Sequence, residues 1–245
     1  MQKSRSSVAA PPRRRRITGS WISAFALFAY AAGFSFAYNS LSAGTGALLL
    51  FGAVQATMIF WGIKQGERLR AAQVAGVTAA VAGLIVLVFP GLSAPPLVGS
   101  ALMLAAGVAW GIYSLRGKAT NNAIAATAAN FVCAIPFAMV ISLALIAQMR
   151  LNWSGISYAI VSGAITSGFG YVIWYTTLPE LKAATAASVQ LSVPVLTATG
   201  GILFLQEPIT LRYVLASLAV LGGIFLVVIE RQPKRPAELV DGAPR

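Results

Sequence analysis

Apolar runs of about 20 residues recur along almost the whole chain, and they constrain its fold more than any other feature. A helix of about 20 residues spans the roughly 30 Å hydrocarbon core of a bilayer. Transmembrane β-strands are about half as long and alternate in polarity, which these runs do not. We therefore predict an all-α, polytopic membrane protein with about eight transmembrane helices. The predicted spans are Ile17–Tyr38, Ser42–Ile63, Ala71–Phe89, Pro95–Leu115, Ala123–Ala147, Ser154–Leu178, Ala183–Leu205 and Leu211–Ile229.

Composition supports the same class. Of the 245 residues, 58% are hydrophobic and only 10% are charged, whereas soluble domains carry about 25% charged residues. A soluble fold of this length could not bury so much apolar surface. The chain has no histidine, which excludes His-based metal sites and catalysis, and its single cysteine, Cys133, is expected to be a small buried hydrophobe. We predict no cofactor and no metal.

The basic residues predict the orientation of the chain. The net charge of +12 would suggest a nucleic-acid partner in a soluble protein, but the Lys and Arg residues lie in short clusters between the apolar runs. If the N-terminus is inside, all of them except Arg150 and Arg212 fall on the cytoplasmic side. We therefore expect a multi-pass inner-membrane protein with both termini in the cytoplasm and no nucleic-acid partner. Residues 1–16 are expected to form a disordered basic cytoplasmic tail, and residues 230–245 a second cytoplasmic tail.

The chain also contains an internal repeat. The segment Ile17–Phe89 aligns without a gap on Ser157–Ile229, and the alignment pairs Glu67 with Glu207 at the same break between two helices. By the charge distribution, the two copies cross the membrane in opposite directions. Inverted repeats of this kind are typical of secondary transporters.

Several motifs in the second half resemble the EamA-type transporters of the drug/metabolite transporter superfamily. The motifs are Gly168-Phe-Gly-Tyr171, Trp174-Tyr175, Ala186-Ala-Ser-Val-Gln-Leu-Ser-Val-Pro-Val195, Gly200-Gly201, Leu205-Gln-Glu-Pro208 and, in the first half, Gly66-Glu-Arg-Leu69. The resemblance implies an inverted-repeat fold of ten helices in two repeats of five, cytoplasmic termini, and export of amino acids or related metabolites. This chain departs from the pattern, because residues 17–89 supply three helices of a first repeat and residues 95–229 supply five of a second.

Polar side chains inside predicted spans are candidates for the substrate cavity, because burying them in hydrocarbon is costly. The Gln190 amide could bind a polar solute or form a hydrogen bond between helices. Gln55 and Asn130 also lie mid-span, and a structural role is favoured for both. No carboxylate lies at mid-membrane, so we expect facilitated diffusion or exchange rather than proton coupling through a buried acid.

Two groups of aromatic residues are further candidates. Trp110, Tyr171 and Trp174 lie deep enough in their spans to line a cavity. Tyr113 and Tyr175 lie near span ends, where tyrosine commonly anchors at the membrane interface, and we predict that role for both.

Prolines and glycines inside the spans suggest hinges. Pro194 and Pro136 each remove a backbone hydrogen bond, and Gly200-Gly201 weakens the helix of Pro194 again. The alternative is close helix packing at small residues, which we favour for pairs such as Gly107/Gly111. Glu67 and Glu207 are interpreted as caps or repeat contacts rather than coupling groups.

The leading functional hypothesis is a transporter, an exporter or facilitator, that moves a small metabolite such as an amino acid by alternating access. An enzyme is not expected, because no nucleophile-and-base set or carboxylate pair lies within the spans. The alternative hypothesis is a truncated, non-transporting remnant or a subunit that needs a homo-oligomer or partner helices. The expected partners are the lipid bilayer and a small-molecule solute.

Overall fold

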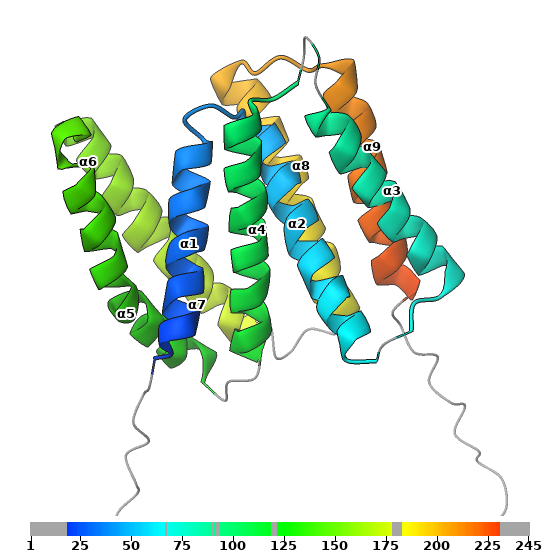
Figure 1. Ribbon diagram of the computed structural model, residues 1–245, viewed down its shortest axis with the longest axis horizontal. Helices are drawn as coiled ribbons and strands as arrows, with labels where there is room; N and C mark the ends of the chain where they lie inside the picture. The colour runs from blue at the N-terminus through cyan, green and yellow to red at the C-terminus, as the bar shows by residue number, and fades with distance from the viewer. Residues whose placement is uncertain are drawn as a thin grey trace, which may run out of the picture.

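The computed structural model describes residues 19–66, 68–89, 91, 94–118, 122–177 and 183–230, and they form a bundle of α-helices (Figure 1). Every predicted span contains a helix. The helices are α1 (Trp21–Ala37), α2 (Ala43–Lys64), α3 (Ala71–Val88), α4 (Leu97–Lys118), α5 (Ala123–Ala144), α6 (Trp153–Ile160), α7 (Gly168–Thr177), α8 (Ala183–Leu205) and α9 (Leu211–Glu230). A π-helical segment, η2 (Val161–Ser167), joins α6 to α7 within one span, and a 3-10 turn, η1 (Ile146–Gln148), follows α5.

Six of the described helical stretches are long and apolar enough to cross a bilayer. They correspond to α2, α3, α4, α5, the joined α6–η2–α7 and α9. The remaining two predicted spans contain shorter apolar helices, Trp21–Ala37 and Ser192–Leu205. The all-α, polytopic membrane fold is therefore confirmed.

Small residues bring the central helices together. Figure 1 shows α1, α4 and α2 side by side, with α8 behind α2 and the α3–α9 pair next to them. A Cβ placed on Gly107 of α4 would lie 2.5 Å from the carbonyl oxygen of Leu50 on α2, and one on Gly111 would lie 2.8 Å from Thr57. Membrane helices lack a hydrophobic driving force between them and associate through such close contacts, so Gly107 and Gly111 have the packing role favoured from the sequence.

The α3–α9 pair is the most extensive contact between described helices. A Cβ on Gly76 would lie 2.5 Å from the carbonyl oxygen of Gly223, and one on Gly83 would lie 3.0 Å from that of Ala216. The alignment of the two repeats places Gly76 on Ala216 and Gly83 on Gly223. The contacts are therefore reciprocal, as in an interface between two copies of one surface. The two helices run in opposite directions (Figure 1).

Both ends of the described chain lie at the same end of the bundle, since α1 begins there and α9 ends there (Figure 1). The opposite end carries the turn from α1 to α2, the start of α4 and the turn from α8 to α9. The candidate site described next reaches this second end.

Candidate solute path

A continuous row of aromatic rings connects three helices, α7, α4 and α1. Ring centroids are 5.8 Å apart between Tyr171 on α7 and Trp110 on α4, and 4.7 Å apart between Trp110 and Tyr30 on α1. The row continues along α1 from Tyr30 to Phe34 at 5.7 Å and from Phe34 to Tyr38 at 4.7 Å. We call these five residues the aromatic row. All five side chains are half-buried, so each ring keeps a partly exposed surface.

Two of the sequence candidates, Trp110 and Tyr171, belong to this row, and Trp174 is half-buried on the same helix as Tyr171. Tyr113 does not lie at the membrane interface as predicted. It is 2% exposed, and its hydroxyl donates a hydrogen bond of 3.0 Å to Oγ1 of Thr127 on α5. Its burial comes from packing: Tyr113 belongs to a buried cluster with Ala26 and Leu27 of α1, and its ring stacks on Trp110. The side chain of Tyr175 lies outside the described part of the chain.

The polar candidates have different surroundings. Asn130 is buried, and its Oδ1 accepts a hydrogen bond of 2.9 Å from the backbone N–H of Ser20, the residue before α1. This contact places the start of α1 against α5, so Asn130 has a structural role. Gln55 is half-buried midway along α2. The side chain of Gln190 and the whole of Glu67 are outside the described residues.

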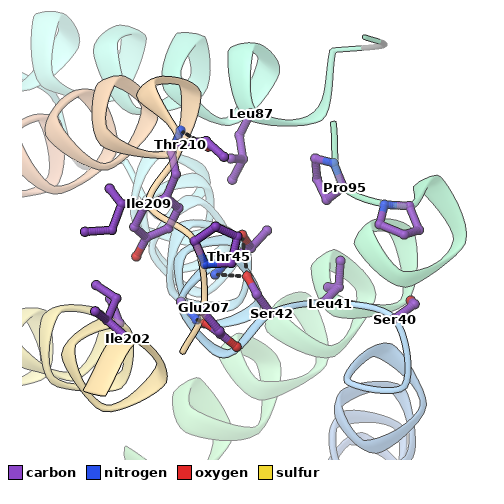
Figure 2. A pocket seen from close by; sticks show the side chains of 15 residues that line it. Ser40, Leu41, Ser42, Thr45, Leu87, Pro95, Ile202, Glu207, Ile209 and Thr210 are labelled. Atoms are coloured by element: carbon purple, nitrogen blue, oxygen red, sulfur yellow. Dashed lines mark hydrogen bonds between the residues drawn. The ribbon is translucent and has the colours of Figure 1, made fainter. Parts of the chain in front are cut away.

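A pocket with a mixed polar and apolar lining lies at the end of the bundle where the aromatic row finishes. Its volume is about 180 Å³, and we call it the Glu207 pocket. Its walls come from the starts of α2 and α4, the end of α3, the last turns of α8 and the turn before α9 (Figure 2). The lining residues are Ser40, Leu41, Ser42, Gly44, Thr45, Leu87, Pro95, Pro96, Ala198, Ile202, Glu207, Pro208, Ile209, Thr210 and Tyr213.

Glu207 caps a helix from the other half of the chain. Its Oε1 accepts a hydrogen bond of 2.5 Å from the backbone N–H of Ala43, and its Oε2 accepts a longer one of 3.4 Å from that of Gly44. These N–H groups belong to the first turn of α2, where backbone N–H groups have no acceptor within the helix. The dipole of α2 also favours a negative charge at this end. The predicted capping role of Glu207 is thus observed, although the capped helix is distant in sequence.

Two glycines make this approach to α2 feasible. A side chain at Gly201 would overlap the Glu207 carboxylate and meet Ala43, and a Cβ on Gly44 would lie 2.7 Å from the hydroxyl oxygen of Tyr213. A glycine at position 201 is therefore needed for this packing, and its role as a hinge stays a prediction.

The other hinge candidates differ in their surroundings. Pro194 is buried within α8, and Pro136 is exposed within α5. A Cβ on Gly200 would meet no atom within 4 Å.

The aromatic row and the Glu207 pocket meet at Tyr38. The Tyr38 hydroxyl donates a hydrogen bond of 3.2 Å to the carbonyl oxygen of Ala43, whose N–H binds Glu207. The ring of Tyr38 lies against Gly46, where a Cβ would be 2.5 Å from its Cε1 atom. The sequence alone does not single out Tyr30, Tyr38 or Tyr213. The first two follow one face of an aromatic-rich helix, which is the only signal that could have indicated them.

The chemistry available here suits binding more than catalysis. No lysine or arginine lines the pocket among the residues described. No group of His, Cys, Asp and Glu able to hold a metal occurs in the described ranges either. A carboxylate, hydroxyl groups and half-buried rings can bind and orient a small solute.

These features define a polytopic α-helical membrane protein. The model of the EamA-like transporter family matches residues 97–229. An uncharacterized protein of Pseudomonas aeruginosa is 52% identical over 222 residues, which are 89% of this chain and 77% of that protein. The chain belongs to the EamA-like transporter family, and it is a membrane transporter rather than an enzyme.

More distant relatives agree with this assignment. An uncharacterized transporter of Archaeoglobus fulgidus is 29% identical over 78% of this chain and 70% of its own length. The threonine/homoserine exporter RhtA of Salmonella typhimurium is 27% identical over 64% of this chain and 56% of its own length. One solved crystal structure superposes with a TM-score of 0.55 at 19% identity, covering 86% of this chain and 75% of that chain, and it supports the fold alone.

Proposed function

We propose that this transporter moves a small polar metabolite, such as an amino acid, across the inner membrane as an exporter or facilitator. The observation that carries the proposal is the aromatic row, which leads from α7 through α4 and α1 to the Glu207 pocket. Half-buried rings followed by a carboxylate offer successive contacts to a solute that has both apolar and charged parts.

The substrate class has separate support. The relative named as a threonine/homoserine exporter suggests amino acids with short side chains. The pocket volume of about 180 Å³ is below the roughly 300–1,000 Å³ typical of drug-sized ligands, which also favours a small metabolite.

The proposed mechanism is alternating access between inverted repeats, residues 17–89 and 95–229. The reciprocal contacts of α3 and α9 support it, because an in-plane two-fold relation lets the two halves exchange conformations. If both termini are cytoplasmic, the Glu207 pocket lies at the extracytoplasmic end. In this arrangement the solute would leave or enter the membrane beside Glu207.

Transport can be tested with the full chain in proteoliposomes. We expect efflux of preloaded L-threonine or L-homoserine above that of protein-free vesicles. Trp110→Ala should lower the rate by about two- to thirtyfold, because a cation–π contact is worth about 0.5–2 kcal/mol. Trp153→Ala is the matched control, since Trp153 is 84% exposed at the start of α6.

Two results would count against this function. Efflux equal to that of empty vesicles for a broad panel of amino acids and polar metabolites would refute transport of this class. A rate abolished by collapsing the pH gradient alone would refute facilitated diffusion or exchange in favour of proton coupling.

A subunit that acts with other helices is the second candidate. No residue is buried in the most apolar 18-residue window of the span Trp153–Trp174. Apart from contacts such as that of Tyr171 with Trp110, most of its surface is therefore available to lipid or to a protein partner. A cross-linked oligomer in native membranes would support this candidate, and a monomer active in liposomes would contradict it.

A further inference from the structure

We propose that the Glu207 pocket binds the solute through its primary ammonium group, with Glu207 as the residue that determines specificity. This inference rests on the proposed function. It starts from a charge without a counter-ion: Glu207 is half-buried, and no basic side chain lines its pocket in the part of the chain that the structure describes. A carboxylate withdrawn from water without a cationic partner favours binding of a cation.

The carboxylate keeps capacity for a ligand. Its two oxygens offer about four acceptor positions, and the N–H groups of Ala43 and Gly44 occupy two of them, one through a long contact of 3.4 Å. A primary ammonium group carries three N–H donors. It can therefore bind Glu207 without displacing the helix contacts, and a charge-assisted hydrogen bond is stronger than a neutral one.

The rest of the pocket matches a small ligand with a short polar or aliphatic part. Hydroxyl groups of Ser42, Thr45, Thr210 and Tyr213 are among the lining groups. Apolar side chains form other parts of the wall, including Ile202 and Ile209, which Figure 2 shows on the side of α8 and the turn before α9. A volume of about 180 Å³ leaves space for an amino acid or amino alcohol rather than a large amphiphile.

The approach to the pocket also favours a cation. Tyr38 ends the aromatic row and is joined to Glu207 through the backbone of Ala43. Aromatic faces attract cations such as ammonium groups, whereas they do not attract carboxylates. A solute that carries an ammonium group therefore meets compatible surfaces along the row and at its end.

Binding can be measured without transport. The full chain in lipid nanodiscs would be titrated with radiolabelled L-threonine, and unlabelled ethanolamine, L-homoserine and N-acetyl-L-threonine would be used as competitors. Ethanolamine has the ammonium group without a carboxylate, and the acetylated compound has the carboxylate without the ammonium group. We expect ethanolamine and homoserine to compete, and N-acetyl-threonine to compete at least about tenfold more weakly.

The variant Glu207→Gln keeps an amide oxygen that can accept from Ala43 but removes the charge, and it should weaken threonine binding by about tenfold or more. Glu230→Gln is the matched control, because Glu230 is the last residue of α9, about 30 Å along the helix from Leu211 at its start. Thermal melting of each variant shows whether it is folded, and Glu207→Asp provides a second carboxylate variant that should retain more affinity than Glu207→Gln.

Equal affinity of the wild type and a folded Glu207→Gln variant would overturn the proposal. So would equal competition by N-acetyl-threonine, or no binding by any of the three ammonium compounds. The proposed function can fail separately from the proposed site. If binding depends on Glu207 but no flux is observed, the ammonium site stands and the proposed transport of this solute class is refuted. If the flux is unchanged by Glu207→Gln and by acetylation of the solute, the proposed transport stands and the ammonium site is refuted.

Discussion

Replacing Gly76 by alanine tests whether the close approach of α3 and α9 is essential to the fold. The new methyl group would lie 2.5 Å from the carbonyl oxygen of Gly223, whereas ordinary contacts between carbon and carbonyl oxygen are about 3.3–3.6 Å. The helices must therefore separate locally by about 1 Å, because the obstructing atom belongs to the backbone and cannot rotate away. Overpacking of this kind costs about 1–3 kcal/mol of the free energy of unfolding.

The reciprocal variant, Gly223→Ala, should have a similar cost. Its methyl group would meet the backbone of Gly76 and lie 2.8 Å from the backbone nitrogen of Ala80. One separation of the two helices relieves both clashes, so the double variant should lose less than the sum of the single losses. Directly contacting sites commonly show couplings of about 0.5–3 kcal/mol, and we expect about 1 kcal/mol here.

The assay is reversible unfolding in mixed micelles, followed by circular dichroism as the fraction of denaturing detergent increases. Gly222→Ala is the control on the same helix, because a Cβ there would meet no atom within 4 Å. It should be neutral or stabilising by up to about 1 kcal/mol, from the higher helix propensity of alanine. Single variants as stable as the wild type, or strictly additive losses in the double variant, would refute the reasoning.

Three other changes test individual contacts. Tyr113→Phe removes the buried hydroxyl hydrogen bond to Thr127 and should lower the free energy of unfolding by about 1 kcal/mol in the same assay. An unchanged free energy of unfolding would show that this 3.0 Å hydrogen bond does not stabilise the fold. Asn130→Ala removes the acceptor for the N–H before α1, so amide hydrogen exchange of the first turn of α1 should accelerate several-fold while that of α9 stays constant. Pro194→Ala and Gly200→Ala should each slow transport if α8 bends during the cycle, and unchanged rates in both would remove the hinge hypothesis; a methyl group fits at Gly200 without contact, so a loss there would report flexibility rather than a clash.

The helices could be predicted from the sequence because hydrocarbon imposes a length on each span. The same length requirement does not predict which residues near the end of a span are buried by neighbouring helices. The position of Tyr113 near the expected span end at Leu115 predicts the interface, but Ala26 and Leu27 of α1 cover its ring and Thr127 of α5 accepts its hydroxyl hydrogen bond. The side chain is therefore buried by contacts with neighbouring helices, which the position of a residue in its own span does not reveal.

The candidate site could be predicted only in part. Trp110 and Tyr171 were selected because bulky aromatic groups deep in a span are candidates to line a cavity. Tyr30 and Tyr38 were missed, because α1 contains several aromatic residues and its sequence does not show which of them face α4. That choice depends on the small residues of α1 and α4, which determine how closely and at what rotation the two helices pack.

For Glu207, the sequence predicts the capping role but not which helix the carboxylate caps. A glutamate at a helix break is commonly a cap, and Glu207 does cap a helix, but the helix is α2, which the sequence separates from it by most of the chain. The carboxylate consequently joins the two halves that the proposed cycle must move apart at this end. Separating them breaks the bonds from Ala43 and Gly44, and an unpaired carboxylate would be costly unless water or a cation replaced those donors. In the proposed cycle an ammonium group supplies that replacement with a charge-assisted bond, so solute binding and opening of this end would use the same carboxylate.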